Sequence, residues 1–296
     1  MDKKYEINEM NEYVDSLRDK SPNTIRMYVS AIDKFILGTG LKTFEDMKNL
    51  STRDTDKYQR HLQETLSAAS VNSNIRPINA MYNWLIRMEY LDKNPFSKIR
   101  AVREQEKVQA FLSNEEMIAL VNNAKDTEEK LMLLMLMQLG LRRSELTNIS
   151  IEDVASRTHI VINGKGGKQR LLALHSDIVG VLNRWTAIRN QKFPDTNLKW
   201  LFISRRGGKY SGDTILRRIK RAMKRAGFSQ SRIDEIHTHS LRHTFTANLF
   251  EGGADIYVAQ QLLGHSDINT TKRYAHLRDN VRDNAVLQQK SILSNK

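Results

Sequence analysis

Four short segments in the second half of the chain place arginine, lysine, histidine and tyrosine at spacings that suit chemistry on an anion. In the first, Arg142 and Glu145 lie three residues apart, so on a helix they share one face. The carboxylate can then hold the guanidinium in a fixed orientation. The second is the glycine-rich run 164–170, whose glycines let the backbone approach a ligand while Lys165 projects from it. This run lacks the Gly-x4-Gly-Lys-Ser/Thr pattern of a nucleotide-binding loop.

The third and fourth segments contain histidines. His239 and Arg242 are three residues apart, and His265 is followed nine residues later by Tyr274. His239 and His243 are four residues apart, a spacing that can chelate zinc on a helix. The chain has no cysteine and no His-Glu-x-x-His motif, and the neighbouring arginine opposes a bound cation. We therefore predict no metal site in these segments.

Charge and composition narrow the classes of partner. The chain has 296 residues, no cysteine and a formal net charge of +13, and residues 151–250 alone hold 19 basic and 7 acidic side chains. A concentrated positive field attracts a polyanion, and nucleic acid is the commonest one. The N-terminus has no apolar signal segment, and the longest apolar run, 131–137, is far shorter than the roughly 20 residues of a membrane span. We expect a cytoplasmic, nucleoid-associated protein with no membrane partner.

The first hundred residues have the pattern of a helical domain. Ser21 followed by Pro22 predicts a helix start, because serine caps a helix and proline fits its first turn. Apolar residues then recur at helical spacing until Gly38, where we expect the helix to end. A later helix is predicted over residues 71–86, with Pro77 near its first turns, so a kink or a late start is expected.

Two domains are predicted. Residues 1–100 form the helical N-terminal domain, and residues 101–112, with mixed charge and weak periodicity after an Asn-Pro pair, are typical of a linker. Ser113 and Glu116 have the spacing of a capping box, which predicts the start of a second domain over residues 113–296 that includes a C-terminal tail.

The second domain is predicted to be mainly helical with a small β-hairpin. Residues 128–139 are strongly apolar and predict a helix at the centre of the core. Residues 158–162 and 169–174 are rich in β-formers and flank the glycine-rich turn 163–167. Overall, the fold class is mainly α, with a helical N-terminal domain and a mixed α/β catalytic domain.

A strongly basic helix is predicted near the end of the basic stretch. Asp213 is expected to cap it and Gly227 to close it, with an apolar face around Ile215, Ile219 and Met223. Six cations fill the remaining surface: Arg217, Arg218, Lys220, Arg221, Lys224 and Arg225. We predict that these six side chains bind DNA, and a merely solvated basic face is the alternative.

In order and spacing, the four segments resemble those of the tyrosine recombinase family, which includes phage integrases and Xer-type recombinases. The family pattern joins Gly-[Leu/Met]-Arg-x-[Ser/Gly]-Glu, a lysine in a Gly-Lys-Gly hairpin, His-x-x-Arg, and Leu-Gly-His followed nine residues later by tyrosine. The matching residues are Arg142, Lys165, His239, Arg242, His265 and Tyr274, with Glu145 in support. The first hundred residues resemble the family's SAM-like core-binding domain, so the resemblance covers nearly the whole chain. Chain length and residues 262–276 are most similar to Xer-type members.

Two positions depart from the family pattern. Leu139 stands where the family usually has threonine, and Arg143 stands where an aliphatic residue is more usual. Arg143 is therefore an alternative to Arg142 as the catalytic arginine, and the spacing to Glu145 favours Arg142.

The matching residues suit the attack of a phenol on a DNA phosphodiester. Tyr274 would be the nucleophile, and Arg142 and Arg242 would bind the non-bridging oxygens as negative charge builds on them. Lys165 would protonate the leaving 5′-oxygen, and the two motif histidines would share the phenol proton and a phosphate contact. No metal or nucleotide cofactor is expected, because the arginines supply the charge and the phosphotyrosyl bond stores the bond energy.

The resemblance implies site-specific strand exchange on duplex DNA through a 3′-phosphotyrosyl intermediate, with the two domains closing on the duplex like a clamp. It also implies a homo- or hetero-tetramer on DNA that is weak or monomeric off DNA. An Xer-like role in resolving chromosome or plasmid dimers is favoured. The alternatives are an integrase or excisionase of a mobile element, a type IB topoisomerase, and a DNA-binding protein without catalysis. The amphipathic tail over residues 281–293 is expected to dock on its own chain or on a neighbouring protomer.

Overall fold

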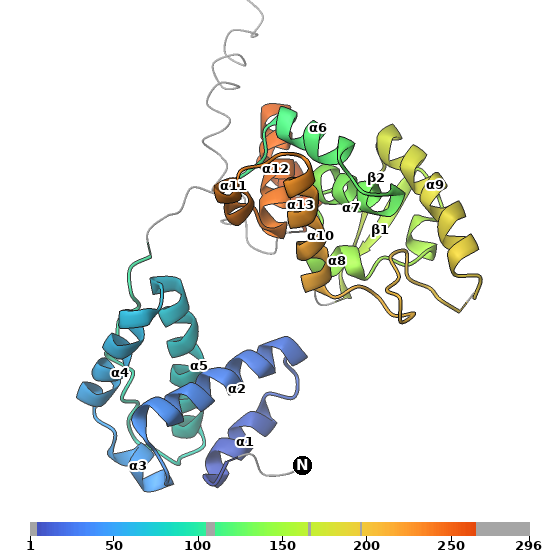
Figure 1. The fold of residues 1–296 in the computed structure, drawn as a ribbon. Helices are drawn as coiled ribbons and strands as arrows, with labels where there is room; N and C mark the ends of the chain where they lie inside the picture. The colour runs from blue at the N-terminus through green and yellow to red at the C-terminus, as the bar shows by residue number, and fades with distance from the viewer. Residues whose placement is uncertain (1–4, 105–109, 165–166, 196, 265–296) are drawn as a thin grey trace, which may run out of the picture. The chain divides into compact units, whose positions relative to one another are not determined.

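The computed structural model describes residues 5–104, 110–164, 167–195 and 197–264. The chain divides into two compact units, residues 1–107 and residues 108–296, and each is described by itself. The fold of the described residues is mainly helical with one two-stranded sheet, as the sequence predicts (Figure 1). Across these same ranges, no helix is both long and apolar enough to cross a membrane.

The first unit is a helical domain. Its helices are α1 (Asn8–Ser16), α2 (Pro22–Thr39), α3 (Phe44–Asn49), α4 (Thr52–Thr65) and α5 (Ala68–Arg87). Their apolar faces enclose a core around Phe35, which is fully buried. The ring of Phe35 lies edge-on to Tyr58 and Phe96, with centroids 5.2 and 5.6 Å away, the geometry that aromatic quadrupoles favour.

Helix α2 begins where predicted and ends later than predicted. Ser21 caps it, with Oγ accepting a hydrogen bond from the backbone N–H three residues on, and Pro22 is its first residue. Gly38 does not end the helix, which runs to Thr39 and is closed by Gly40 in the left-handed conformation at φ 72°. Gly38 serves packing instead, because a Cβ there would lie 2.8 Å from the ring of Tyr58.

Of the two alternatives that Pro77 raises, the late start is wrong, because helix α5 begins at Ala68 and includes Pro77. Ser67 caps it, accepting a hydrogen bond from the backbone N–H of Ser70 at 3.3 Å, and the helix then runs continuously through Pro77. Pro77 is buried together with Ile78 and Met81 on the core face. Burial of the apolar ring offsets part of the cost of the hydrogen bond that proline cannot donate.

Buried polar side chains bind the segment after α5, residues 95–104, to α4 and α5. We call it the 95–104 segment. Thr55 Oγ1, Gln59 Nε2 and Asn72 Nδ2 donate to the backbone carbonyls of Pro95, Arg100 and Val102, at 3.0, 2.9 and 2.9 Å respectively. Asn72 also accepts from the backbone N–H of Val102 at 2.8 Å. Gln59 and Asn72 therefore find their described partners in the 95–104 segment, whereas Thr55 Oγ1 also donates to the carbonyl of Thr52 in its own helix at 2.9 Å.

The second unit surrounds one apolar helix. Its helices are α6 (Asn114–Asn122), α7 (Thr127–Gln138), α8 (Arg143–Thr147), α9 (Ser176–Lys192), α10 (Gly212–Arg225), α11 (Gln230–Glu235), α12 (Thr238–Glu251) and α13 (Ile256–Leu263), with a 3₁₀ turn over Glu152–Val154. Helix α7 occupies the centre, as predicted, and residues 131–137 are all buried. It packs against α6, α8, α9 and α12, so the C-terminal end of α7 is held firmly where the first chemical motif begins.

The predicted hairpin is the sheet of the second unit. Strands β1 (His159–Asn163) and β2 (Gln169–Ala173) pair antiparallel, with Ile162 opposite Arg170. The turn between them is closed by a hydrogen bond from the backbone N–H of Gly164 to the carbonyl of Lys168 at 2.7 Å. Lys165 lies in this turn, outside the described residues.

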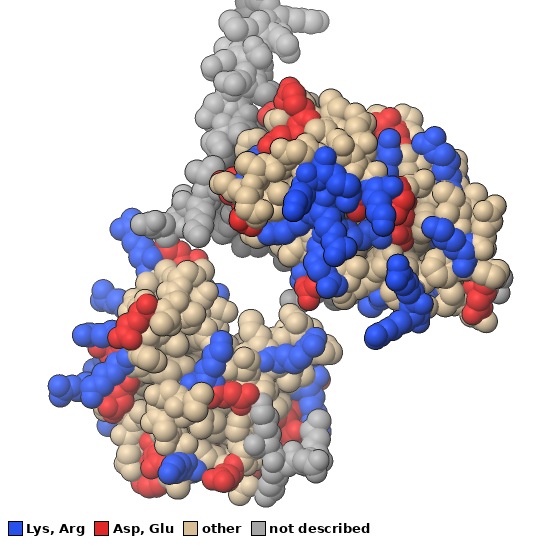
Figure 2. Space-filling view, viewed as in Figure 1, with Lys and Arg blue, Asp and Glu red and all other residues tan. Residues whose placement is uncertain are grey.

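The basic helix is α10, and its cap differs from the prediction. Ser211 caps it, accepting a hydrogen bond from the backbone N–H of Thr214 at 3.2 Å, and Asp213 lies in its first turn. Both residue types cap well, but only serine stands three residues before that N–H group. Ile215 and Ile219 are buried on the inner face, and Lys and Arg side chains gather over α10 on the face of the second unit that Figure 2 shows.

Candidate active site

Arg142 and Glu145 form the ion pair that their spacing predicts. Arg142 is the residue before α8, and its backbone N–H and Nη1 both donate to the Glu145 carboxylate, at 2.8 and 2.6 Å. The neighbouring Arg143 instead reaches Asp213, with 3.4 Å between Nη1 and Oδ1. Of the two arginines, Arg142 is therefore the one bonded to Glu145, and the group formed by Glu145, Arg142, Arg170, Arg242 and the carbonyls that these arginines bind is called the pocket below.

Arg242 lies beside this pair. It belongs to α12, is 4% exposed, and donates through Nη1 to the carbonyl of Gly140 at 2.6 Å and through Nη2 to that of Leu263 at 2.5 Å. Its Nη1 is also 3.8 Å from Oε2 of Glu145. Two arginines separated by a hundred residues of sequence thus converge on one buried carboxylate.

A third arginine in the same pocket was missed by the sequence analysis. Arg170 of β2 donates through Nη1 and Nη2 to the two oxygens of Glu145, each at 2.9 Å. Its side chain is 12% exposed and that of Glu145 is 3% exposed. A signal existed in the strand pattern, because Arg170 stands two residues before the buried Leu172 and therefore shares its inward face.

The C-terminal end of α13 completes the described pocket. Gly264 closes this helix in the left-handed conformation at φ 62°. Its carbonyl accepts a hydrogen bond from Nη2 of Arg142 at 2.9 Å. The next residue along the chain is His265. His265 and Tyr274 lie outside the described residues, as does Lys165.

His239 occupies the first turn of α12, three residues before Arg242. Partial burial of its ring, followed by the positive charges of Arg242 and Arg142, lowers the pKa of His239 below its ordinary value. The neutral imidazole can then accept a proton. The ring centroid of His243 is 6.5 Å away, and the part of the chain that the structure describes holds no group of three or more His, Asp or Glu side chains arranged for a metal ion.

The pocket carries more positive than negative charge. Burial raises the pKa of Glu145, but hydrogen bonds from Arg170 and Arg142 outweigh it and lower the pKa to about 2, so the carboxylate is ionised at neutral pH. Burial and the nearby charge of Arg142 lower the pKa of Arg242 to about 9, which leaves it protonated. Three guanidinium groups therefore face one carboxylate, an arrangement that suits a bound anion whose charge increases during a reaction.

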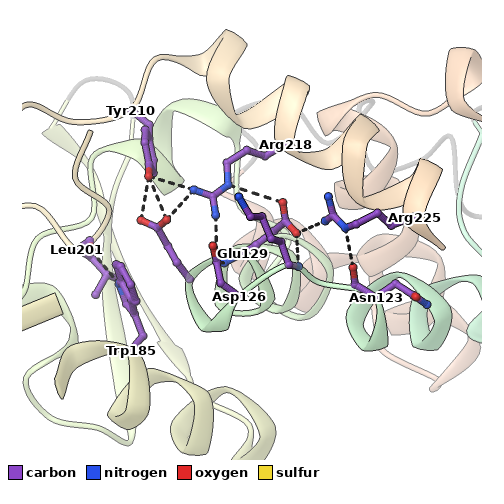
Figure 3. Close-up of polar contacts among 10 residues, drawn as sticks. Asn123, Asp126, Glu129, Trp185, Leu201, Tyr210, Arg218 and Arg225 are labelled. Carbon is purple, nitrogen blue, oxygen red and sulfur yellow. Dashed lines mark hydrogen bonds and ion pairs between the residues drawn. The ribbon is translucent and has the colours of Figure 1, made fainter. Parts of the chain in front are cut away.

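The six cations predicted to bind DNA differ in their contacts within the protein. Arg218 pairs with Glu128 at 2.6 Å and with Asp126 at 3.2 Å, and Arg225 pairs with Glu129 and donates to the carbonyl of Asn123 (Figure 3). These contacts fasten α10 to the N-terminal turn of α7. Burial raises the pKa of Glu128, because a buried carboxylate loses its hydration. The ion pair with Arg218 offsets part of that desolvation cost.

Three of the other four cations are exposed and have no ion pair to another described residue. The fourth, Lys220, lies 3.7 Å from Asp234. The three exposed cations are Arg217, Arg221 and Lys224. They stand four and three residues apart, so they line one stripe of α10.

Comparison with known proteins defines the class. Residues 109–281 match the phage integrase family, and residues 7–92 match the N-terminal SAM-like domain of phage integrases. A tyrosine recombinase of Thermosipho africanus is 28% identical over 97% of this chain and 99% of its own length. Tyrosine recombinase XerA of Pyrococcus horikoshii is 31% identical over 89% of this chain and 88% of its own length.

Solved structures share the fold. The XerH site-specific recombinase bound to its palindromic difH substrate superimposes with a TM-score of 0.73 at 19% identity, covering 94% of this chain and 84% of XerH. The XerA recombinase structure gives a TM-score of 0.53 at 26% identity, covering 96% of this chain and 99% of the XerA chain. The chain therefore belongs to the phage integrase family and is a tyrosine recombinase, an enzyme that breaks and rejoins DNA.

Proposed function

We propose that this recombinase exchanges strands at a specific duplex site through a 3′-phosphotyrosyl intermediate formed by Tyr274. The observation that carries the proposal is the convergence of Arg142 and Arg242 on Glu145, with both guanidinium groups also bonded to the end of α13. Two fixed cations beside each other suit the two non-bridging oxygens of one phosphate. The chain reaches His265 one residue later and Tyr274 nine residues after that.

In the proposed reaction, the phenol oxygen of Tyr274 bonds to phosphorus and the bond to the 5′-oxygen breaks. Lys165 gives its proton to that oxygen, and His239, whose lowered pKa keeps it neutral, shares with His265 the acceptance of the phenol proton. Arg142 and Arg242 stabilise the charge that accumulates on the non-bridging oxygens. Attack by a free 5′-hydroxyl reverses the step and joins the new strand, so no external energy source is required.

Tyr274→Phe tests the nucleophile. A target site is first selected from random duplexes with the Tyr274→Phe protein, which is expected to bind without cleaving. Wild-type protein should then form an adduct on that site that survives denaturation, and Tyr274→Phe should form none. Tyr257→Phe, a change at an exposed tyrosine of α13, serves as the matched control and should form the adduct normally. Adducts with Tyr274→Phe would overturn the assignment.

We infer that the DNA-binding surface includes the stripe of Arg217, Arg221 and Lys224, because these cations are exposed and free of ion pairs to other described residues. Phosphate contacts of this kind supply affinity without reading sequence. Arg218 and Arg225 hold the helix in place, and Lys220 lies beside Asp234.

We further propose an Xer-like role, the resolution of chromosome or plasmid dimers by a tetramer assembled on DNA, in the cytoplasm at the nucleoid. Support comes from relatives named XerA and XerC, and from a lambda integrase tetramer of similar fold that is bound to a Holliday junction. A plasmid with two direct copies of the selected site tests this role. Efficient resolution, with the selected sequence present once in the chromosome, supports it. A selected sequence at the ends of a mobile element would favour an integrase instead.

A further inference from the structure

Arg170 of β2 is a charged residue of the pocket to which the proposed reaction gives no role. Its two described hydrogen bonds both go to Glu145, and its buried Nε has no partner among the described residues. A guanidinium that is 12% exposed is costly unless it is paired. The pair with Glu145 is therefore what permits an arginine at this inward-facing position of the strand.

The bonds from Arg170 fix the plane of the Glu145 carboxylate. Oε1 accepts from Nη1 of Arg170 and from Nη1 of Arg142, whereas Oε2 accepts from Nη2 of Arg170 and from the backbone N–H of Arg142. A bidentate guanidinium sets the orientation of a carboxylate as well as its position. Arg142 donates to the lone pairs of the same two oxygens that Arg170 leaves free. Arg170 of β2 therefore also sets the orientation of Arg142.

Gly264 connects Arg170 to the other side of Arg142. A Cβ on Gly264 would lie 3.1 Å from Nη1 of Arg170, so the guanidinium packs directly against this glycine. The carbonyl of the same glycine accepts from Nη2 of Arg142 at 2.9 Å. Arg142 is thus held between Glu145 and Gly264, and Arg170 contacts both.

Arg170 also changes the charge that a phosphate would meet. Glu145 lies within ion-pair distance of Arg142, Arg170 and Arg242. With Arg170 present, one positive charge balances the carboxylate, and the charges of Arg142 and Arg242 remain in excess. Without Arg170, the carboxylate would draw on those two arginines and weaken their attraction for the developing negative charge.

We propose that Arg170 is a positioning residue for strand cleavage: it acts through Glu145 to orient Arg142 and to leave Arg142 and Arg242 their charge, without touching the phosphate. This inference rests on the roles proposed above for Arg142, Arg242 and Tyr274. Because β2 begins just after the turn that contains Lys165, Arg170 also joins the strand of that hairpin to the arginine pocket.

The first test compares three variants of the full chain on the selected site. The substrate is a duplex with a nick next to the scissile phosphate, so that the cleaved end is lost and the covalent adduct accumulates. Arg170→Met keeps the length of the side chain and removes its charge and hydrogen bonds. It should lower the rate of adduct formation by about 100-fold, the order expected when a catalytic group is misplaced by about 1 Å, with DNA affinity unchanged within about threefold. Arg170→Lys, which retains the charge, should recover part of the rate. Arg157→Met, which removes an arginine bonded to Thr186 in the same unit, should cleave normally.

A second substrate separates positioning from folding. Replacing one non-bridging oxygen of the scissile phosphate by methyl removes its negative charge, so the arginines have less charge to stabilise. The defect of Arg170→Met should shrink to less than about fivefold on this substrate, as should that of Arg142→Ala. A misfolded protein would be equally defective on both substrates. An Arg170→Met defect of the same size on both would therefore overturn the inference.

A double-mutant cycle tests the route through Glu145. If Arg170 acts on the reaction through this carboxylate, Arg170→Met should add less than about threefold to the defect of Glu145→Gln. Fully multiplicative defects would show that Arg170 acts by another route and would overturn the inference. Wild-type protein that forms no adduct at all would instead contradict the proposed function, so the two failures are distinguishable.

Discussion

The guanidinium of Arg142 donates a hydrogen bond to the carbonyl oxygen of Gly264 at 2.9 Å, across 122 residues of sequence. Arg242 makes the equivalent contact with the preceding residue, Leu263, at 2.5 Å. The two arginines that we propose to bind phosphate therefore also hold the end of α13, from which the chain leads to His265. Groups pre-organised in this way need little rearrangement in the transition state.

Glu145→Gln should lower the free energy of unfolding at neutral pH, and the loss should diminish in acid. The pKa of Glu145 falls from 4.5 to about 2 in the folded protein. A carboxylate with a depressed folded pKa contributes stability that is complete above its unfolded pKa, near 4.5, and is lost as the pH falls towards 2. The contribution at neutral pH is about 3 kcal/mol. Urea unfolding of both proteins near neutral pH and at roughly pH 3 measures it, and a pH-independent difference would contradict this account.

Arg218→Met and Arg221→Met should have opposite signatures. Removing Arg218 leaves Glu128 buried without its cation and should cost about 3–5 kcal/mol of stability. Arg221→Met should change stability by less than about 0.5 kcal/mol. It should weaken DNA binding and lower the slope of log affinity against log salt by about one. Thermal unfolding and salt titrations of binding give both quantities. An unchanged salt slope for Arg221→Met would remove this side chain from the DNA interface.

Gly140→Ala should disrupt the pocket. Gly140 has φ 58°, and a Cβ there would lie 2.3 Å from the ring of Phe245. The substitution should cost about 1–3 kcal/mol and displace the carbonyl that binds Arg242. Gly180→Ala is the matched control, because nothing lies within 4 Å of its Cβ position in α9, and it should stabilise the protein by about 0.5–1 kcal/mol. Equal stability of the two variants would contradict the packing described for Gly140.

Lys165→Ala should be far more damaging when the leaving group is an ordinary 5′-oxygen than when it is a 5′-sulfur. A thiolate leaves without a proton, whereas loss of a general acid typically slows departure of an alkoxide by about 10²–10⁴-fold. Lys168→Ala, in the same hairpin, is the control and should cleave both substrates normally. Adduct formation on both substrates measures the effect. Equal defects for Lys165→Ala would mean that this lysine positions the phosphate.

Deleting residues 284–296 should leave binding to a half-site nearly intact and weaken cooperative binding to the full site. The reason is the amphipathic pattern of the tail, which is short for a helix that is stable alone and so calls for a partner groove. Gel-shift titrations on half and full sites measure the half-site binding constant and the cooperativity constant separately. Undiminished cooperativity in the truncated protein would place the groove on the same chain.

Local structure could be predicted where it depends on residues three or four apart. Ser113 and Glu116 make both hydrogen bonds of the predicted capping box, at 3.2 and 2.9 Å. The hairpin forms across the glycine-rich turn as expected. The ion pair of Arg142 and Glu145 also follows from spacing, because Arg142 is the residue before α8 and Glu145 lies in the first turn of that helix.

Long-range pairing could not be predicted in the same way. Arg170 finds Glu145 across 25 residues, and Arg218 finds Glu128 across 90. The strand pattern places Arg170 on the inward face of β2, but only the packing of β2 and α10 decides which carboxylate each arginine meets. Pattern alone therefore did not show that Arg218 and Arg225 pair with carboxylates, and it overlooked the third arginine that binds Glu145.

The 95–104 segment determines where the first unit can be separated or grafted. The family match of this unit ends at residue 92, and α5 ends earlier still, at Arg87. A fragment cut there would lose the hydrogen bonds from Thr55, Gln59 and Asn72 to this segment, at roughly 0.5–1.5 kcal/mol each, and the burial of Phe96 against Phe35, worth roughly 1.5–3 kcal/mol. Such a loss is comparable to the whole stability of a small domain. A chimaera that exchanges this unit with that of another recombinase should therefore place its junction after Glu104.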